Sequence, residues 1–182
     1  MRVIAGIYKG RALSSPSDPS ISPTSGKVKE ALFSILTDEI LNSRFLDIFS
    51  GSGAVGIEAL SRGAAFTVFI DENRDSIKTI KENLARLGIK SNYDLFPGDY
   101  IASLRRLDGD FNVIFADPPY AFKDYDLLFK TVMELNLLKD DGLFIVEHRK
   151  DVKLPFSVHG LINVKCKKYG TASMSIYNKI LL

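Results

Sequence analysis

Hydrophobic positions follow two alternating patterns along most of the chain. Short, nearly continuous apolar runs predict five strands, over residues 45–49, 67–70, 92–96, 112–116 and 143–147. Between these runs, apolar residues recur every three or four positions, which predicts helices over residues 55–61, 75–87, 100–107 and 125–135. Apolar strands that alternate with helices are typical of a parallel sheet covered on both faces.

The two ends of the chain depart from this pattern. Residues 2–6 and 10–13 predict a small hairpin, and a Pro/Ser-rich loop follows over residues 14–24. Helical spacing begins at Lys27, with Thr24 or Ser25 as the candidate N-cap. Near the other end, residues 161–168 and 173–180 predict two strands that form an antiparallel hairpin at the sheet edge. We therefore expect an extension over residues 1–24 and one α/β domain with a seven-stranded mixed sheet over residues 25–182.

Composition narrows the class of protein. The chain has 182 residues, of which 46% are hydrophobic and 25% charged, so one compact domain with a sizeable core is expected. No apolar run reaches the roughly 18–20 residues needed to span a bilayer, and the opening residues turn polar too soon for a signal peptide. Cys166 is the only cysteine, which excludes an internal disulfide and a cysteine cluster for zinc. A cytoplasmic, metal-free protein is the expectation.

The net charge of +2 conceals an uneven distribution. Residues 1–36 carry five Lys/Arg against two Asp/Glu, and residues 149–182 carry seven against one. The middle, residues 37–148, carries twelve Lys/Arg against nineteen Asp/Glu. Basic ends around an acidic middle are compatible with a polyanionic partner held by the termini, and equally with solvated lysines on ordinary surface strands.

A glycine-rich segment with the spacing Gly51-x-Gly53-x-x-Gly56 follows the first predicted strand and opens a helix. Glycines at these positions allow a tight turn and let a ligand approach the helix N-terminus. Asp71 stands twenty residues after Gly51, at the end of the next strand, where its carboxylate can accept both hydroxyls of a ribose. This much fits NAD or FAD as well as S-adenosylmethionine.

Asp47, inside the strand before the glycines, favours S-adenosylmethionine over a dinucleotide. A pyrophosphate needs an apolar strand end, whereas a ligand with an ammonium and a sulfonium is better served by a nearby carboxylate. Asp99 follows the third strand. Its carboxylate can accept a hydrogen bond from the amino group of the cofactor's adenine, or it can act as the N-cap of a helix. Glu58 can reach the cofactor or favour the helix dipole. The expected cofactor site comprises Asp47, Phe49, Gly51, Ser52, Gly53, Asp71, Glu72, Asp99 and Tyr100.

Asp117-Pro118-Pro119-Tyr120 ends the fourth predicted strand. In a doubly wound sheet this strand neighbours the first, so its carboxyl end lies across the crevice from the glycines. An exocyclic amine on a base is a poor nucleophile because its lone pair is delocalised into the ring. The Asp117 carboxylate and the Pro118 carbonyl can each accept one N–H and so direct the lone pair towards a methyl donor. The two prolines stiffen the loop, and Tyr120 offers a face on which an extruded base can stack. These four residues are the predicted catalytic site.

Together these motifs resemble the bacterial RsmD-type family of small-subunit (16S) ribosomal RNA guanine-N2 methyltransferases. The resemblance covers nearly the whole chain, and its family-specific part is the N-terminal block. That block includes Arg2-Val3-Ile4-Ala5-Gly6, Lys9-Gly10-Arg11, and Pro23-Thr24 followed by Lys27-Val28-Lys29-Glu30-Ala31-Leu32-Phe33. The chain departs from the family at Ser22, where an arginine usually precedes the Pro-Thr pair. Lys27 and Lys29 also stand where arginine is common.

The resemblance implies a class I methyltransferase fold of Rossmann-like type with S-adenosylmethionine as cofactor and no metal. It implies a guanine in 16S rRNA as the acceptor, within a 30S particle or assembly intermediate, and a monomeric enzyme. The implied RNA contacts, centred on the extension, are Lys9, Arg11, Thr24, Lys27 and Lys29.

Three alternatives remain open at this point. An adenine-N6 DNA methyltransferase shares the Asp-Pro-Pro-Tyr motif, although 182 residues leave little room for a DNA target-recognition domain. A nicotinamide oxidoreductase shares the glycine spacing. A non-catalytic RNA-binding module would account for the basic ends alone.

Overall fold

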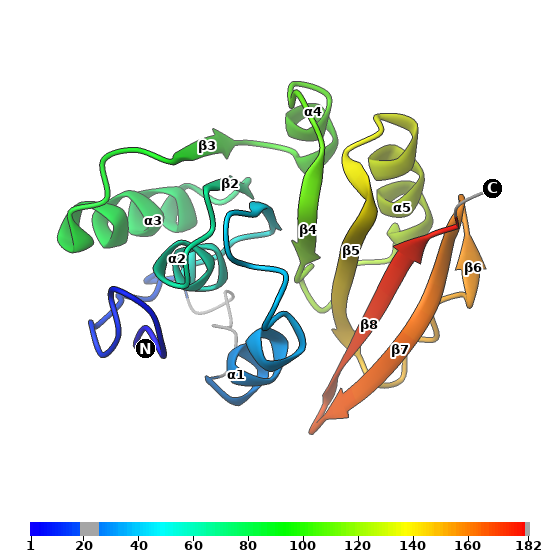
Figure 1. Cartoon of the computed structure of the whole chain (residues 1–182), viewed down its shortest axis with the longest axis horizontal. Helices are drawn as coiled ribbons and strands as arrows, with labels where there is room; N and C mark the ends of the chain where they lie inside the picture. Colours follow the sequence, from blue (N-terminus) through cyan, green and yellow to red (C-terminus); the bar gives the residue numbers. More distant parts are fainter. Residues whose placement is uncertain (19–25, 181–182) are drawn as a thin grey trace.

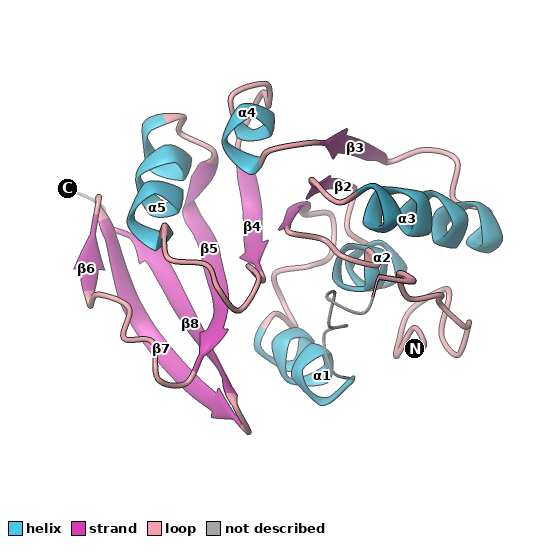
Figure 2. Ribbon diagram, turned by 180° about the vertical axis from the view of Figure 1, so that it is seen from behind, coloured by secondary structure: helices cyan, strands magenta, loops and turns pink. Residues whose placement is uncertain are grey.

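A single mixed sheet with helices on both faces forms the centre of the protein (Figures 1 and 2). The computed structural model describes residues 1–18 and 26–180. Its helices are α1 (Gly26–Ile35), α2 (Ala54–Ser61), α3 (Arg74–Leu87), α4 (Tyr100–Leu104) and α5 (Tyr125–Glu134). Its strands are β1 (Arg44–Ile48), β2 (Phe66–Asp71), β3 (Tyr93–Pro97), β4 (Phe111–Ala116), β5 (Leu138–Arg149), β6 (Ser157–Val158), β7 (Leu161–Tyr169) and β8 (Ala172–Lys179).

The strand order is β3-β2-β1-β4-β5-β8-β7-β6. The first five strands pair in parallel, and β8, β7 and β6 add antiparallel strands at one edge. This is the predicted class of fold, a Rossmann-like mixed sheet, with eight strands instead of seven. The additional strand, β6, contains two residues and pairs with the start of β7, which is too short to leave a pattern in the sequence.

The order of the strands reverses beside β1, and this places the ligand-binding crevice. β1 pairs with β2 on one side and with β4 on the other, so Ile48 lies between Ile70 and Ala116 at the carboxyl end of all three strands. The loops that leave β1 and β4 therefore diverge from neighbouring positions. In open α/β sheets, such a switch point is where ligands bind.

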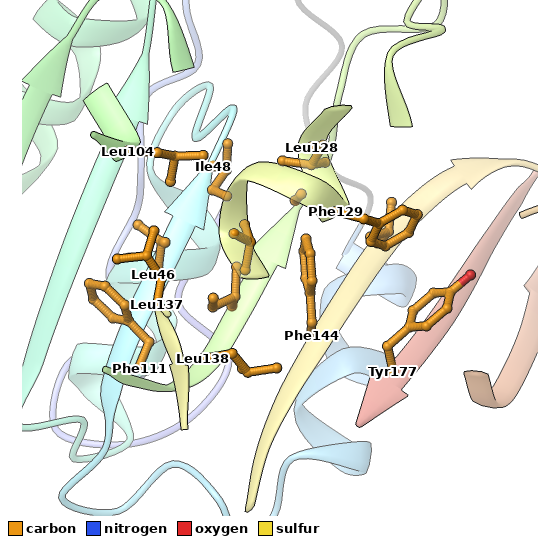
Figure 3. Packing of buried hydrophobic residues seen from close by; sticks show 14 of the residues in the cluster. Leu46, Ile48, Leu104, Phe111, Leu128, Phe129, Leu137, Leu138, Phe144 and Tyr177 are labelled. Carbon is orange, nitrogen blue, oxygen red and sulfur yellow. The ribbon is translucent and has the colours of Figure 1, made fainter. Parts of the chain in front are cut away.

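Each face of the sheet buries its own apolar cluster. On one face, α4 and α5 cover a cluster in which Phe129 packs against Phe144 and Tyr177, with ring centroids 5.4 and 4.8 Å apart (Figure 3). On the other face, α1 and α2 cover Phe45, Phe115 and neighbouring residues of β5 and β8. No helix among the described residues has the length and apolar character needed to cross a membrane.

The predicted N-terminal hairpin is present but short. Arg2 and Ala12 form an antiparallel bridge, flanked by bonds from the Val3 N–H to the Arg11 carbonyl at 3.0 Å and from the Leu13 N–H to the Met1 carbonyl at 2.9 Å. This pairing is too short to make regular strands of residues 2–6 and 10–13, and beyond it the N–H groups of Ile4 and Ala5 donate to the Glu58 carboxylate of α2 at 2.8 and 2.9 Å. The expected caps of α1, Thr24 and Ser25, lie outside the described residues.

Candidate active site

The glycine loop between β1 and α2 is held by a short network of backbone and side-chain bonds. Gly51 and Gly53 have positive φ angles of 54° and 74°, in the left-handed region where glycine is favoured. The Gly51 N–H donates to the Asp71 carboxylate at 2.8 Å, which ties the loop to the end of β2. Gly56 is required for packing, since a Cβ there would lie 2.3 Å from the Phe69 ring. The loop is therefore fixed with its open side towards the carboxyl edge of the sheet.

Asp47 lies beneath this loop. Its side chain is 1% exposed and accepts a hydrogen bond from the Gly56 N–H at 2.9 Å. Burial, together with the nearby charges of Asp117 and Asp71, raises the pKa of the Asp47 carboxyl to about 8. The residue does not line the cavity described below. Any influence of Asp47 on a ligand therefore acts through its charge and through the position of the loop.

The Asp-Pro-Pro-Tyr segment leaves β4 beside the glycine loop. The Asp117 N–H donates to the Ile48 carbonyl of β1 at 3.3 Å, and the Phe122 N–H closes a turn by donating to the Pro119 carbonyl at 2.8 Å. Tyr120 projects from this turn with 64% of its surface exposed. The segment is thus a rigid turn, with an acid at its start and an accessible aromatic ring at its end.

A cavity of about 550 Å³ joins these parts. That volume falls within the range of small-molecule and cofactor sites. Of the predicted site residues, those that line the cavity are Phe49, Gly51, Ser52, Asp71, Glu72, Asp117, Pro118, Pro119 and Tyr120. The structure therefore brings the predicted catalytic segment and most of the predicted cofactor residues to one place.

Carboxylates outnumber cationic side chains in the lining of the cavity, where Asp71, Glu72, Asp117 and Glu147 stand against Arg149. Burial raises the pKa of Asp71, and burial with the charge of Asp117 raises the pKa of Glu147 to about 8. Burial is the main cause of both shifts, and the contribution of Asp117 at Glu147 shows that these two acids lie close enough for a cation between them to favour their ionised forms. Among the described residues, no three His, Cys, Asp or Glu side chains form a group suited to a metal ion.

Phe49 has a positive φ of 62°, which is strained for a bulky residue. Its ring packs against Tyr100 and Phe122, with centroids 5.0 and 5.3 Å apart. This aromatic cluster forms the wall of the loop on the α4 side. Tyr100 was predicted to contact the cofactor directly, but it does not line the cavity and instead supports Phe49.

Two further predicted cofactor residues also lie off the cavity. Asp99 caps α4, with its Oδ1 accepting the Ala102 N–H at 2.9 Å, so the capping alternative describes its contact in this structure. Gly53 is the left-handed N-cap of α2 and shapes the loop from behind.

The predicted RNA contacts divide into three groups. Lys9, Arg11 and Lys27 are exposed. Thr24, like Ser22, lies outside the described residues. The prediction for Lys29 is wrong: its side chain is 1% exposed, and its ammonium lies 3.0 Å from the Glu58 carboxylate and 2.8 Å from the Arg2 carbonyl. A lysine on the inner face of α1 cannot reach an RNA phosphate.

Glu58 serves neither of the two roles considered from the sequence. It is fully buried and binds Lys29, Arg62 and the N–H groups of Ile4 and Ala5. Burial alone would raise its pKa, but these backbone and cationic partners outweigh burial and lower the pKa. Glu58 therefore anchors the N-terminal segment to α2.

Sequence reasoning missed several cavity residues on β5, β7 and β8. The main ones are Glu147 and Arg149 at the end of β5, and Tyr169 at the end of β7. Glu147 ends the strand predicted over residues 143–147, and parallel strands end at the same edge, so its position in the predicted sheet was the available signal. The place of Tyr169 in the cavity lining depends on how the antiparallel strands β7 and β8 are arranged at the sheet edge, which the local sequence pattern does not show.

Comparison with known proteins was consistent with this geometry. The family model described as conserved hypothetical protein 95 matches residues 1–178. YlbH of Bacillus subtilis, provisionally named an rRNA methyltransferase, is 36% identical over 182 residues, covering 98% of this chain and 99% of that protein. Ribosomal RNA small subunit methyltransferase D of Haemophilus influenzae is 33% identical over 180 residues, covering 97% and 93%. The solved structure of yhhF from Escherichia coli, provisionally named a methyltransferase, superposes with a TM-score of 0.87 at 30% identity, covering 98% and 97%.

Proposed function

Because the chain belongs to the conserved hypothetical protein 95 family of RsmD-type methyltransferases, we propose that it methylates the exocyclic N2 of a guanine in small-subunit rRNA, with S-adenosylmethionine as the donor. One observation carries the proposal: the glycine loop and Asp117-Pro118-Pro119-Tyr120 face each other across one acid-lined cavity. The acceptor is a 30S particle or an assembly intermediate. The enzyme acts in the cytoplasm as a monomer without a metal. Residues 1–24 contribute RNA contacts, through Lys9 and Arg11 among others, and residues 25–182 carry the methyltransferase domain.

The cavity fits S-adenosylmethionine in size and in charge. Gly51 and Ser52 border the space where the helix α2 begins, and Asp71 and Glu72 stand at the end of β2 where a ribose would be held. The acidic lining favours a ligand that carries an ammonium and a sulfonium. When bound, S-adenosylmethionine supplies an electrophilic methyl group.

Asp117, Pro118 and Tyr120 act on the acceptor amine. The Asp117 carboxylate and the Pro118 carbonyl accept hydrogen bonds from the two N–H groups of the amine. These bonds turn the nitrogen lone pair towards the methyl group, and they stabilise the positive charge that develops on the nitrogen. Tyr120, on the exposed side of the turn, stacks on the base and stabilises it by about 1–3 kcal/mol. Alignment of the nitrogen with the methyl group supplies much of the remaining catalysis.

The function is tested by incubating labelled S-adenosylmethionine with 30S particles and with free rRNA from a strain that lacks the gene, and by mapping the labelled base. Label at guanine N2 supports the proposal. Label at adenine or cytosine would refute the guanine assignment. Calorimetry separates the other classes: binding of NAD without binding of S-adenosylhomocysteine indicates an oxidoreductase, and RNA binding without methyl transfer indicates a binding module.

The affinity for S-adenosylmethionine is expected to rise with pH. The pKa of Asp47 is raised to about 8, so below that pH the carboxyl must release a proton before its charge can favour a cation. Titration calorimetry from pH 6 to pH 9 should show affinity rising by up to about tenfold per pH unit and levelling off above the pKa. Asp47→Asn should weaken binding and flatten the profile. An unchanged slope in that variant would show that Asp47 is not the group responsible.

Glu147 supports guanine as the acceptor. Its register places it next to the start of the Asp-Pro-Pro-Tyr segment, because Val146 pairs with Ala116. Its Oε2 is buried and has no hydrogen-bond partner in the described part of the chain. Guanine presents an N1–H donor beside N2, whereas adenine presents an acceptor at the equivalent position beside N6. Glu147 therefore favours guanine in its ionised form, which predominates above its raised pKa of about 8.

Replacing Glu147 by glutamine is expected to lower kcat/KM for the rRNA substrate by about 10- to 100-fold, the worth of a hydrogen bond to a charged group. The amide keeps the size of the side chain but cannot ionise, so the comparison is made above pH 8, where Glu147 carries its charge. Affinity for S-adenosylhomocysteine, measured on the same samples, serves as the control for folding and should change little. Wild-type kcat/KM in this variant would remove Glu147 from the guanine site.

A further inference from the structure

The outer strand β7 presents two lysines and a tyrosine on the face of the sheet that α1 covers. We call Lys165, Lys167 and Tyr169 the β7 stripe. In the antiparallel register, these three residues lie opposite Ile176, Met174 and Ala172 of β8. Directly paired residues point to the same face of a sheet, and Ile176 and Met174 belong to the apolar cluster beneath α1. The β7 stripe therefore flanks α1.

The lysines of the β7 stripe are available to a partner. Lys165 is exposed and Lys167 is half-buried, because the apolar cluster beneath α1 takes in Met174 and Ile176 of β8 but reaches β7 at Tyr169. Within residues 1–18 and 26–180, neither ammonium forms an ion pair. Lys168 belongs to the opposite face, since it pairs with Ser173 of β8.

The β7 stripe leads directly into the active-site cavity. Tyr169 lines the cavity, as do Thr171 and Ala172 in the turn and strand that follow. Arg149 pairs with Ala172 from the other side, lines the same cavity, and is held by Asp151. Both ribbon views place the β7–β8 turn at the same end of the sheet as α1 and the carboxyl end of β5 (Figures 1 and 2). A nucleic-acid strand with one nucleotide in the cavity can thus continue directly along β7.

The charges at this end of the sheet favour different places for the base and for the phosphates of a nucleic-acid substrate. The cavity carries Asp71, Glu72, Asp117 and Glu147, so phosphates are repelled from its interior. The C-terminal segment, residues 149–182, carries seven Lys/Arg and one Asp. When an extruded base occupies the cavity, its flanking phosphates must therefore be neutralised by cations outside the cavity. Strand β7 provides such cations, Lys165 and Lys167, next to the Tyr169 ring, on which a base can stack.

We propose that the β7 stripe binds the single-stranded RNA backbone that flanks the target nucleotide, with Lys165 and Lys167 on phosphates and Tyr169 beside the adjoining base. The proposal rests on the proposed function, since RNA is the substrate assumed. It adds a second RNA-binding surface, at the edge of the sheet opposite the N-terminal segment that bears Lys9 and Arg11 (Figure 1).

The test compares the double variant Lys165→Gln/Lys167→Gln with the single variants and with Lys168→Gln. Two measurements are made: kcat and KM with 30S particles from a strain lacking the gene, and affinity for a fluorescent single-stranded RNA as a function of salt. For the double variant we expect KM to rise about tenfold, kcat at saturation to stay near wild type, and the slope of log affinity against log salt to fall by about 1–2. Each single variant should show a smaller part of the change.

Lys168→Gln is the matched control, because it removes the same charge from the same strand on the other face. It should leave KM and the salt slope within about twofold of wild type. The inference fails if the double variant keeps the wild-type KM and slope, or if Lys168→Gln has the same effect as the double variant. If the wild type transfers no methyl group, the proposed function fails, and the salt dependence of RNA binding still decides the role of the β7 stripe.

Discussion

Alanine at position 117 is expected to lower the rate of methyl transfer by about 100- to 1,000-fold, the usual cost of removing one preorganised group that stabilises transition-state charge. The Asp117 carboxylate is the acceptor proposed for one N–H of the amine, and no neighbouring side chain has its position at the end of β4. Binding of S-adenosylhomocysteine should be retained. The charge of Asp117 raises the pKa of both Asp47 and Glu147, so its removal eases ionisation of these two acids.

Single-turnover assays with labelled S-adenosylmethionine measure the rate, and calorimetry measures cofactor binding. Asp117→Asn is the matched variant, because the amide retains one acceptor oxygen in the same place; it should lose less activity than Asp117→Ala. Wild-type transfer by the alanine variant would exclude the proposed chemistry of the amine. Loss of cofactor binding in that variant would move Asp117 from the acceptor side of the cavity to the donor side.

The sequence predicted the parallel part of the fold well, for a reason visible in β1 and β4. Both strands are buried on two faces, so their apolar runs stand out between polar loops, and their ends follow from the topology. That topology alone predicted that the glycine loop and Asp117 would lie close together. The strand β5 was harder to delimit, because it begins at Leu138 and contains exposed residues before its apolar run.

The sequence could not predict where long-range contacts override local pattern. Lys29 has the charge of a surface residue, although its spacing to Leu32 and Phe33 puts it on the buried face of α1, where the Glu58 carboxylate of α2 pairs with it. The N-terminal segment pairs as a short hairpin, but its attachment to α2, through the N–H groups of Ile4 and Ala5 and the Glu58 carboxylate, could not be predicted either. Both contacts involve one buried acid whose partners are distant in the sequence.

This buried acid leads to the largest expected effect on stability. Glu58→Ala should reduce the free energy of unfolding by about 3–5 kcal/mol, since it leaves the Lys29 ammonium buried without its carboxylate and orphans the N–H groups of Ile4 and Ala5. In a protein of this size, such a loss lowers Tm by about 10 °C. Thermal and denaturant unfolding monitored by circular dichroism measure both quantities.

Lys29→Met provides the contrast. Methionine fills much of the space of the lysine stem, and Glu58 would still be held by Arg62 at 2.9 Å and by two N–H groups. We therefore expect this variant to lose less stability than Glu58→Ala, about 1–3 kcal/mol. Equal losses in the two variants would mean that the ion pair alone, and not the anchoring of the N-terminal segment, accounts for the effect.

The pH dependence of stability separates these contributions further. The pKa of Glu58 is lowered in the folded protein, so its contribution is present above the pKa of an unfolded glutamate and is lost as the pH falls through the lowered value. Glu58→Ala should therefore unfold with a weaker acid dependence than the wild type. Hydrogen exchange at Ile4 and Ala5 should become faster in Glu58→Ala even where the sheet remains protected, because the acid holds residues 1–13 to α2. Unchanged exchange at these amides would show that the segment is held by the burial of Val3 and Leu13 instead.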